Sequence, residues 1–104
     1  MVAGNGLMIG APESHGDGTT TFTWSEVLPI ATYLVSLTAR EYATWEEQFG
    51  AKPVLYYAYP QDELRAKAAW SATVDMLEAF SELFGDYPFA KYGMVETPMR
   101  GAME

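Results

Sequence analysis

The 104-residue sequence contains no cysteine and a single histidine, His15. The absence of cysteine excludes a disulfide framework, a thiolate zinc site and a cysteine nucleophile. A histidine-rich metal site or a histidine-dependent catalytic triad would have to depend on His15 alone. Because His15 lies in a segment rich in glycine and serine, a solvated loop residue is the simpler interpretation.

Basic residues are also scarce, since Lys and Arg total 6 against 14 Asp and Glu, which gives a net charge of −8. A chain this acidic repels phosphate backbones, so we expect no nucleic-acid partner. The longest apolar stretch, residues 28–39, is interrupted by Pro29 and by hydroxyl-bearing residues, and it is too short to span a membrane. Nothing in the sequence indicates a cellular location.

Hydrophobic residues make up 49% of the chain and aromatic residues 14%, which is typical of a globular protein with a packed core. The half that precedes Pro60 is rich in β-branched and aromatic residues. Alternating apolar residues there predict strands at 19–27, 33–38 and 41–49. Residues 53–59 are apolar on both faces, as in a strand that is covered on both sides.

After Pro60 the apolar period becomes that of a helix, and it predicts one long amphipathic helix over residues 62–84. Asp62 is placed to cap its start, and Glu63 and Lys67 form a favourable i,i+4 pair. Gly85 can end it in a left-handed conformation. The expected core stripe of this helix comprises Ala69, Thr73, Met76, Leu77, Phe80, Leu83 and Phe84.

A short strand at 92–97 completes an α+β fold: a β-rich N-terminal half, one long helix and short edge strands. Nothing after the helix is long enough to cover its apolar stripe, and the strands leave open edges that natural sheets avoid. We therefore expect the chain to be part of a larger domain. A complete small α+β domain is the alternative.

Three motifs occur in a fixed order near the C-terminal end: the segment 84–88 (FGDYP), the predicted strand, and residues 101–104 (GAME). This order resembles that of the zinc aminopeptidases of the aminopeptidase N family, which belong to the gluzincins. In that family a helix ending in Phe-Gly-x-Tyr-Pro is followed by a strand and by a Gly-x-Met-Glu-Asn motif. Upstream, residues 29–37 resemble the family's Pro-x-x-x-Tyr-Leu strand, so the resemblance covers nearly the whole chain.

The resemblance implies substrate-binding roles for Gly101, Ala102, Met103 and Glu104. The family's motif glutamate, here Glu104, binds the free α-amine of the substrate. Gly101 and Ala102 would present backbone groups to the peptide as an added strand does. The expected substrates are therefore peptides with a free N-terminus.

The resemblance also implies a division of the chain. Residues 1–60 correspond to the end of a β-sandwich-like, saddle-shaped N-terminal domain, and residues 61–104 to the start of a thermolysin-like catalytic domain. The family binds zinc through a His-Glu-x-x-His helix, which this sequence lacks. We therefore expect zinc in the parent enzyme but none on this chain, no catalytic residue here, and no activity without the remainder of the catalytic domain. The alternative is a non-catalytic binding or scaffold module, or a relative that has lost its zinc site.

Overall fold

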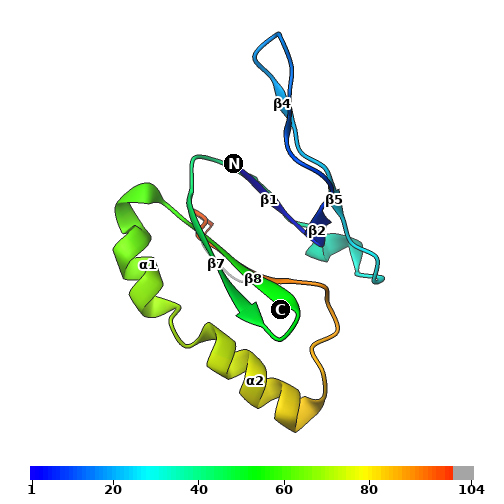
Figure 1. Ribbon diagram of the computed structural model, residues 1–104, viewed down its shortest axis with the longest axis vertical. Coiled ribbons are helices and arrows are strands. Elements are labelled where there is room, and N and C mark those ends of the chain that lie inside the picture. Colours follow the sequence, from blue (N-terminus) through cyan, green and yellow to red (C-terminus); the bar gives the residue numbers. More distant parts are fainter. Residues whose placement is uncertain (100–104) are drawn as a thin grey trace.

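The computed structural model describes residues 1–99, which fold as an α+β structure and confirm the predicted class. The nine strands are β1 (Val2–Gly4), β2 (Leu7–Met8), β3 (Glu13–Ser14), β4 (Thr20–Thr21), β5 (Trp24–Ser25), β6 (Leu37–Ala39), β7 (Ala43–Phe49), β8 (Lys52–Ala58) and β9 (Tyr92–Val95). The α-helices are α1 (Glu63–Ala69) and α2 (Thr73–Phe84), and short 3-10 turns lie at Thr32–Leu34 and Pro60–Asp62. Figure 1 shows the helices along one side of the β7–β8 hairpin and the N-terminal strands on the other.

The central sheet has the order β7-β8-β9. Strands β7 and β8 form an antiparallel hairpin, and β9 runs parallel to β8 with Val54 opposite Tyr92. Strand β8 is buried as the sequence predicts, because Val54, Tyr56, Tyr57 and Ala58 are almost inaccessible to solvent. The central sheet contains strands from both sides of the boundary expected at residue 60. The division of the chain into two domains at that point stays a prediction.

The N-terminal strands form three two-stranded antiparallel ladders, β1-β6, β2-β5 and β3-β4. The β3–β4 hairpin projects from the rest of the molecule (Figure 1). Its turn is built on Asp17 and Gly18, where the Asp17 carboxylate accepts hydrogen bonds from the Thr19 amide (3.0 Å) and hydroxyl (2.7 Å). These bonds hold the pKa of Asp17 below its usual value. The predicted strand at 19–27 is split into β4 and β5, on either side of Phe22 and Thr23.

The predicted strand at 33–38 is wrong over most of its length. Residues Thr32–Leu34 form a 3-10 turn, and only Leu37–Ala39 is a strand. The side chain of Asn5 explains the difference, because it accepts a hydrogen bond from the Ser36 amide (2.7 Å) and donates one to the Leu34 carbonyl (3.2 Å). A distant side chain thus satisfies backbone groups that a strand would have paired in a ladder.

The expected continuous helix over residues 62–84 is also wrong, because it breaks between α1 and α2. At the break the Trp70 carbonyl accepts hydrogen bonds from the Thr73 amide (3.1 Å) and hydroxyl (2.7 Å). The Trp70 ring stacks on Trp45 at 5.8 Å and lies 6.1 Å from Tyr56. The break therefore brings a large aromatic side chain onto the sheet. The Trp70 carbonyl, which the break frees, finds its hydrogen-bond donors nearby in Thr73.

The start of the first helix also differs in part from expectation. Asp62 makes no capping hydrogen bond to the backbone, and its carboxylate pairs with Arg65 at 3.2 Å instead. The predicted pair between Glu63 and Lys67 is confirmed at 2.5 Å. Both pairs are exposed, so each contributes little to stability.

The core lies between α2 and the central sheet. Its centre is Val54, Tyr56 and Leu77, and partly buried hydrophobic residues surround it: Trp45, Phe49, Trp70, Val74, Tyr87, Tyr92 and Met94. The expected core stripe of the helix is only partly buried, because Met76, Phe80, Leu83 and Phe84 remain exposed by 49–81%. Much of the apolar surface of α2 therefore has no cover in the part of the chain that the structure describes.

Candidate functional site

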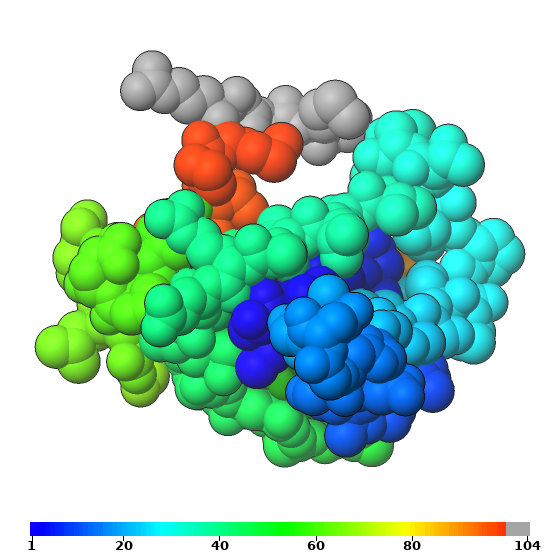
Figure 2. All heavy atoms as spheres, turned by 90° about the horizontal axis from the view of Figure 1, so that it is seen from above, coloured from blue at the N-terminus to red at the C-terminus, as the bar shows by residue number. Residues whose placement is uncertain are grey.

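The four predicted substrate-binding residues, Gly101, Ala102, Met103 and Glu104, lie outside the described residues. The structure does describe the strand that leads to them. Strand β9 lies at the edge of the central sheet, and residues 96–99 continue from it. Figure 2 shows this segment in orange above the green strands. The candidate site is therefore defined by how β9 and its flanking residues are held in place.

Glu96 fixes the backbone immediately after β9. Its amide donates to the Tyr57 carbonyl at 2.8 Å, and its carboxylate accepts from the Tyr59 amide at 2.8 Å. Its own carbonyl accepts a hydrogen bond from the Tyr42 hydroxyl at 3.2 Å. Three contacts to a single residue hold the chain a few residues before Gly101. The sequence contained no signal for this role, because a lone glutamate after a strand has no distinguishing pattern.

An aromatic cluster supports this clamp. The Tyr42 ring lies edge-on to Tyr57 and stacks on Tyr59, with both centroid distances 5.9 Å. The Arg40 guanidinium lies over the Tyr59 ring, 4.3 Å from its centroid. These tyrosines thus pack against one another.

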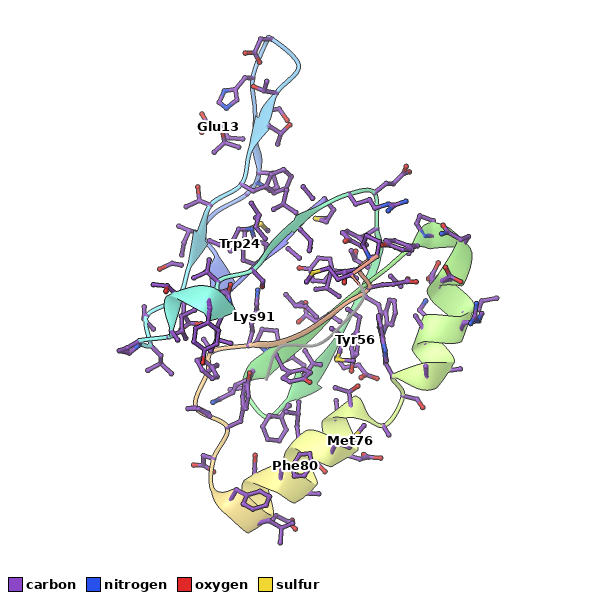
Figure 3. All side chains as sticks on the ribbon, turned by 180° about the vertical axis from the view of Figure 1, so that it is seen from behind. Glu13, Trp24, Tyr56, Met76, Phe80 and Lys91 are labelled. Atoms are coloured by element: carbon purple, nitrogen blue, oxygen red, sulfur yellow. The ribbon has the colours of Figure 1, made fainter. Side chains whose placement is uncertain are left out.

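Lys91 ties the segment before β9 to the N-terminal strands. Its ammonium donates a hydrogen bond to the Gly4 carbonyl at 2.5 Å and lies 4.0 Å from the centroid of the Trp24 ring. Figure 3 shows Lys91 beside Trp24. Burial lowers the pKa of Lys91 to about 8, and the nearby Glu26 carboxylate opposes that shift. A close approach of backbone and ring makes the contact possible, because a Cβ on Gly4 would lie 3.1 Å from the Trp24 ring.

Tyr56 anchors β8 on the face of the central sheet that packs against α2. Its hydroxyl donates to the Glu47 carboxylate on the neighbouring strand at 2.5 Å. Burial, reinforced by this partner, raises the pKa of Tyr56 to about 12. The phenol is thus held protonated and acts as a structural donor.

The described residues, 1–99, do not form a zinc site. Within residues 1–99 no three His, Asp or Glu side chains gather into a possible metal site. His15 lies on the projecting hairpin, where its ring nitrogen Nε2 and the Thr21 hydroxyl are 2.9 Å apart. No chemical step at a metal is therefore derived from these residues, and the expectation that the chain alone binds no zinc stays a prediction.

Two hollows flank β9. One, of about 980 Å³, lies between the N-terminal strands and β9, with Tyr33, Leu34 and Val35 on one side and Thr97 and Met99 on the other. Figure 2 shows the cyan segment and the orange segment facing each other across it. The other lies between α2 and β9 and is lined mainly by apolar side chains. None of the helices described is long and apolar enough to cross a membrane.

Comparison with known proteins finds similarity among solved structures. No protein-family model matches the chain, and no curated protein matches it. Among solved structures, the fold is similar to an M1 zinc metallopeptidase from Deinococcus radiodurans, a mutant bound to a Tyr-Ser-Ala substrate, with a TM-score of 0.64. The two are 24% identical in sequence, and the match covers 97% of this chain. The chain folds like part of a zinc metallopeptidase.

The match covers only 24% of the length of that metallopeptidase. The chain thus spans about a quarter of the protein it resembles. The likeness agrees with the α+β fold predicted from the sequence pattern.

Proposed function

We propose that this chain is part of a zinc-dependent aminopeptidase and contributes the strand that recognises the α-amine of the peptide substrate. One observation carries the proposal: almost the whole chain folds like a segment of a zinc metallopeptidase. The same segment contains, in order, the residues 84–88, the strand β9 and the GAME residues 101–104. Fold and motif order both favour the same family.

The chemistry of the motif suits recognition of a chain end. A peptide N-terminus carries an ammonium ion over most of the neutral range. The carboxylate of Glu104 would accept a charge-assisted hydrogen bond from it, which is stronger than a neutral one. The backbone of Gly101, Ala102 and Met103 would pair with the extended substrate as an added strand. The amine contact then sets which amide of the substrate is cleaved.

The rest of the catalytic apparatus would come from the remainder of the catalytic domain. That part would supply the zinc ligands and the general base, and this chain alone would be inactive. In the parent, residues 1–60 would close the N-terminal β domain and residues 61–104 would open the catalytic domain. Glu96 and Lys91 would hold the recognition strand against residues 1–60.

The test uses the complete gene product that contains this sequence. We expect a His-Glu-x-x-His motif downstream of residue 104, stoichiometric zinc in the purified protein, and hydrolysis of amino-acid anilides that is lost when the amine is acetylated. The 104-residue chain should hydrolyse neither substrate, with or without added zinc. A complete gene product without the zinc motif, or equal cleavage of free and acetylated substrates, would instead favour a non-catalytic module or an unrelated hydrolase.

A further inference from the structure

Asn5 is the only asparagine in the sequence, and a glycine follows it. A side-chain amide in this setting can react with its own backbone, because the nitrogen of the next residue can attack the amide carbon Cγ and displace ammonia. Glycine at the next position favours this attack, since it has no Cβ to hinder the approach of its nitrogen. The sequence therefore places a chemically labile amide at Asn5.

The same amide connects two ladders to a distant loop. Asn5 lies between β1, which pairs with β6, and β2, which pairs with β5. Its oxygen Oδ1 accepts hydrogen bonds from the Ser36 amide (2.7 Å) and hydroxyl (3.4 Å), and its nitrogen Nδ2 donates to the Leu34 carbonyl (3.2 Å). Both ends of the side-chain amide are therefore bound to a segment that is 29 to 31 positions further along the chain.

These hydrogen bonds oppose the reaction. Ring closure requires the Asn5 side chain to fold back over its own backbone, with the face of the amide toward the Gly6 nitrogen. In the structure the amide is instead directed at residues 34–36. The Gly6 backbone is confined as well, because its φ is +71° and a Cβ there would lie 1.9 Å from the Ser25 carbonyl oxygen. Attack on Cγ therefore requires that the bonds to residues 34–36 first break.

We propose that Asn5 is a site of spontaneous deamidation that becomes reactive when residues 32–36 open locally. In the open state the Gly6 nitrogen bonds to Cγ of Asn5, and Nδ2 leaves as ammonia with the proton of the Gly6 amide. The five-membered succinimide that remains then takes up one water. Hydrolysis at Cγ gives aspartate, and hydrolysis at the backbone carbonyl carbon gives isoaspartate, in which the main chain runs through Cβ. The net change replaces ammonia by water.

Neither product can make the contacts that Asn5 makes. An aspartate carboxylate still accepts a hydrogen bond from the Ser36 amide, but it has no hydrogen to donate to the Leu34 carbonyl and brings negative charge beside that oxygen. Isoaspartate lengthens the main chain between β1 and β2 by one carbon. Residues 34–36 form one wall of the hollow of about 980 Å³ beside β9. Deamidation therefore loosens that wall, and it does so whether or not the proposed function is correct.

The first experiment follows deamidation of the 104-residue chain by peptide mapping and mass spectrometry, in buffer and in concentrated urea at the same pH. Because Asn5 is the only asparagine, its peptide reports the reaction without interference from another asparagine. We expect the reaction in buffer to be slower by at least about tenfold, since only the locally open fraction of molecules can react. Equal rates would show that the contacts of Asn5 give no protection. No reaction in urea would show that the amide is not labile, and either result would overturn the proposal.

Amide hydrogen exchange identifies the opening that admits the reaction. The factor by which folding slows deamidation should match the protection factor of the Ser36 amide, which bonds to Asn5. It should lie at least about tenfold below the protection factor of the Glu96 amide, which donates to the Tyr57 carbonyl beside the central sheet. Deamidation that is protected as strongly as Glu96 would show that the whole chain must unfold, and it would contradict a local opening.

Asn5→Asp reproduces the aspartate product and tests its consequence. It should speed hydrogen exchange of the Ser36 amide by at least about tenfold and leave that of the Glu96 amide unchanged. Gln61→Glu makes the same change from amide to carboxylate at an exposed position away from Asn5, and it should alter neither rate. An unchanged Ser36 rate in Asn5→Asp would show that deamidation does not loosen residues 34–36. Faster exchange at Glu96 as well would show that Asn5 supports the whole fold, and it would contradict a local effect.

Discussion

The backbone conformation of Gly6 allows β2 to pair with β5. Its φ is +71°, and a Cβ there would lie 1.9 Å from the Ser25 carbonyl oxygen. No side chain can be accommodated without separating the two strands, because the obstacle is backbone. By contrast, a Cβ on Gly16 would meet nothing within 4 Å.

We predict that Gly6→Ala lowers the free energy of unfolding by more than about 1 kcal/mol, because it combines a left-handed conformation with a backbone clash. Gly16→Ala is the matched control and should change it by less than about 0.5 kcal/mol. Urea denaturation followed by tryptophan fluorescence measures both. Equal effects of the two substitutions would show that β2 and β5 are not held as described.

The two leucines on α2 test where the core ends. Leu77 is 8% exposed at the core, whereas Leu83 is 74% exposed. Leu77→Ala should therefore cost about 2–5 kcal/mol through lost burial and a residual cavity, and Leu83→Ala less than about 0.5 kcal/mol. Chemical denaturation of the two variants gives the comparison. A large loss at Leu83 in the isolated chain would mean that this face is already covered.

Individual residues were predictable where their role is local. The Asp17-Gly18 turn and the Glu63–Lys67 pair follow from short-range rules. The predicted helix cap at Asp62 is absent, because the Asp62 carboxylate pairs with Arg65 instead. The clamp at Glu96 depends on residues from distant strands, and no local rule identifies such a partner.

The elements of the central sheet were the most predictable. Strands β7, β8 and β9 coincide closely with their apolar patterns, because the apolar residues of each strand are at least partly buried. The helix break at Trp70 was not predictable from the helical period, which continues through it. Stacking of Trp70 on Trp45 favours the break, and that contact depends on the tertiary fold. The turn at 32–34 likewise depends on the remote side chain of Asn5.

Lys91 connects the segment before β9 to the N-terminal strands. Its ionisation should make the free energy of unfolding depend on pH. Burial lowers the folded-state pKa of this lysine to about 8, below its unfolded value. Between that pH and about 10 the unfolded chain binds more protons than the folded one, so the free energy of unfolding should rise with pH. Above about pH 10 it should fall again, since burial raises the folded-state pKa values of Tyr56, Tyr57 and Tyr87.

Lys91→Met should remove the rise between pH 8 and 10 and keep the fall above it. Lys67→Met is the control, because Lys67 is exposed and pairs with Glu63 on the helix surface. Urea unfolding at a series of pH values checks both. A rise that persists in Lys91→Met would assign it to another group and remove the basis for treating Lys91 as the tie between β9 and the N-terminal strands.

The whole chain exposes more surface than a compact protein of its size. Its accessible surface is 7518 Å², whereas the scaling for folded monomers of this mass gives about 5,800 Å². Its radius of gyration is 14.8 Å, against about 13 Å for a compact chain of this length. The exposed apolar side chains of α2 contribute to this excess.

We expect the isolated chain to bind a hydrophobic dye such as ANS through the groove beside α2. Phe80→Ser with Phe84→Ser should remove most of the bound-dye fluorescence, because both rings line that groove. Val27→Ser with Leu64→Ser removes residues exposed by 81% and 84% that do not line it, and should leave the signal unchanged. Equal losses in the two double variants would show that exposure anywhere on the chain, and not the groove, attracts the dye.

The proposed substrate-amine role of Glu104 is based on motif order and fold, and steady-state kinetics of the complete gene product tests it most directly. Glu104→Gln keeps the size of the side chain and removes its charge, so kcat/KM for peptides with a free N-terminus should fall by about 10- to 100-fold. Glu13→Gln, on the projecting hairpin, should leave kcat/KM unchanged. An undiminished kcat/KM in Glu104→Gln would contradict the assignment of this chain as the amine-recognition part of an aminopeptidase.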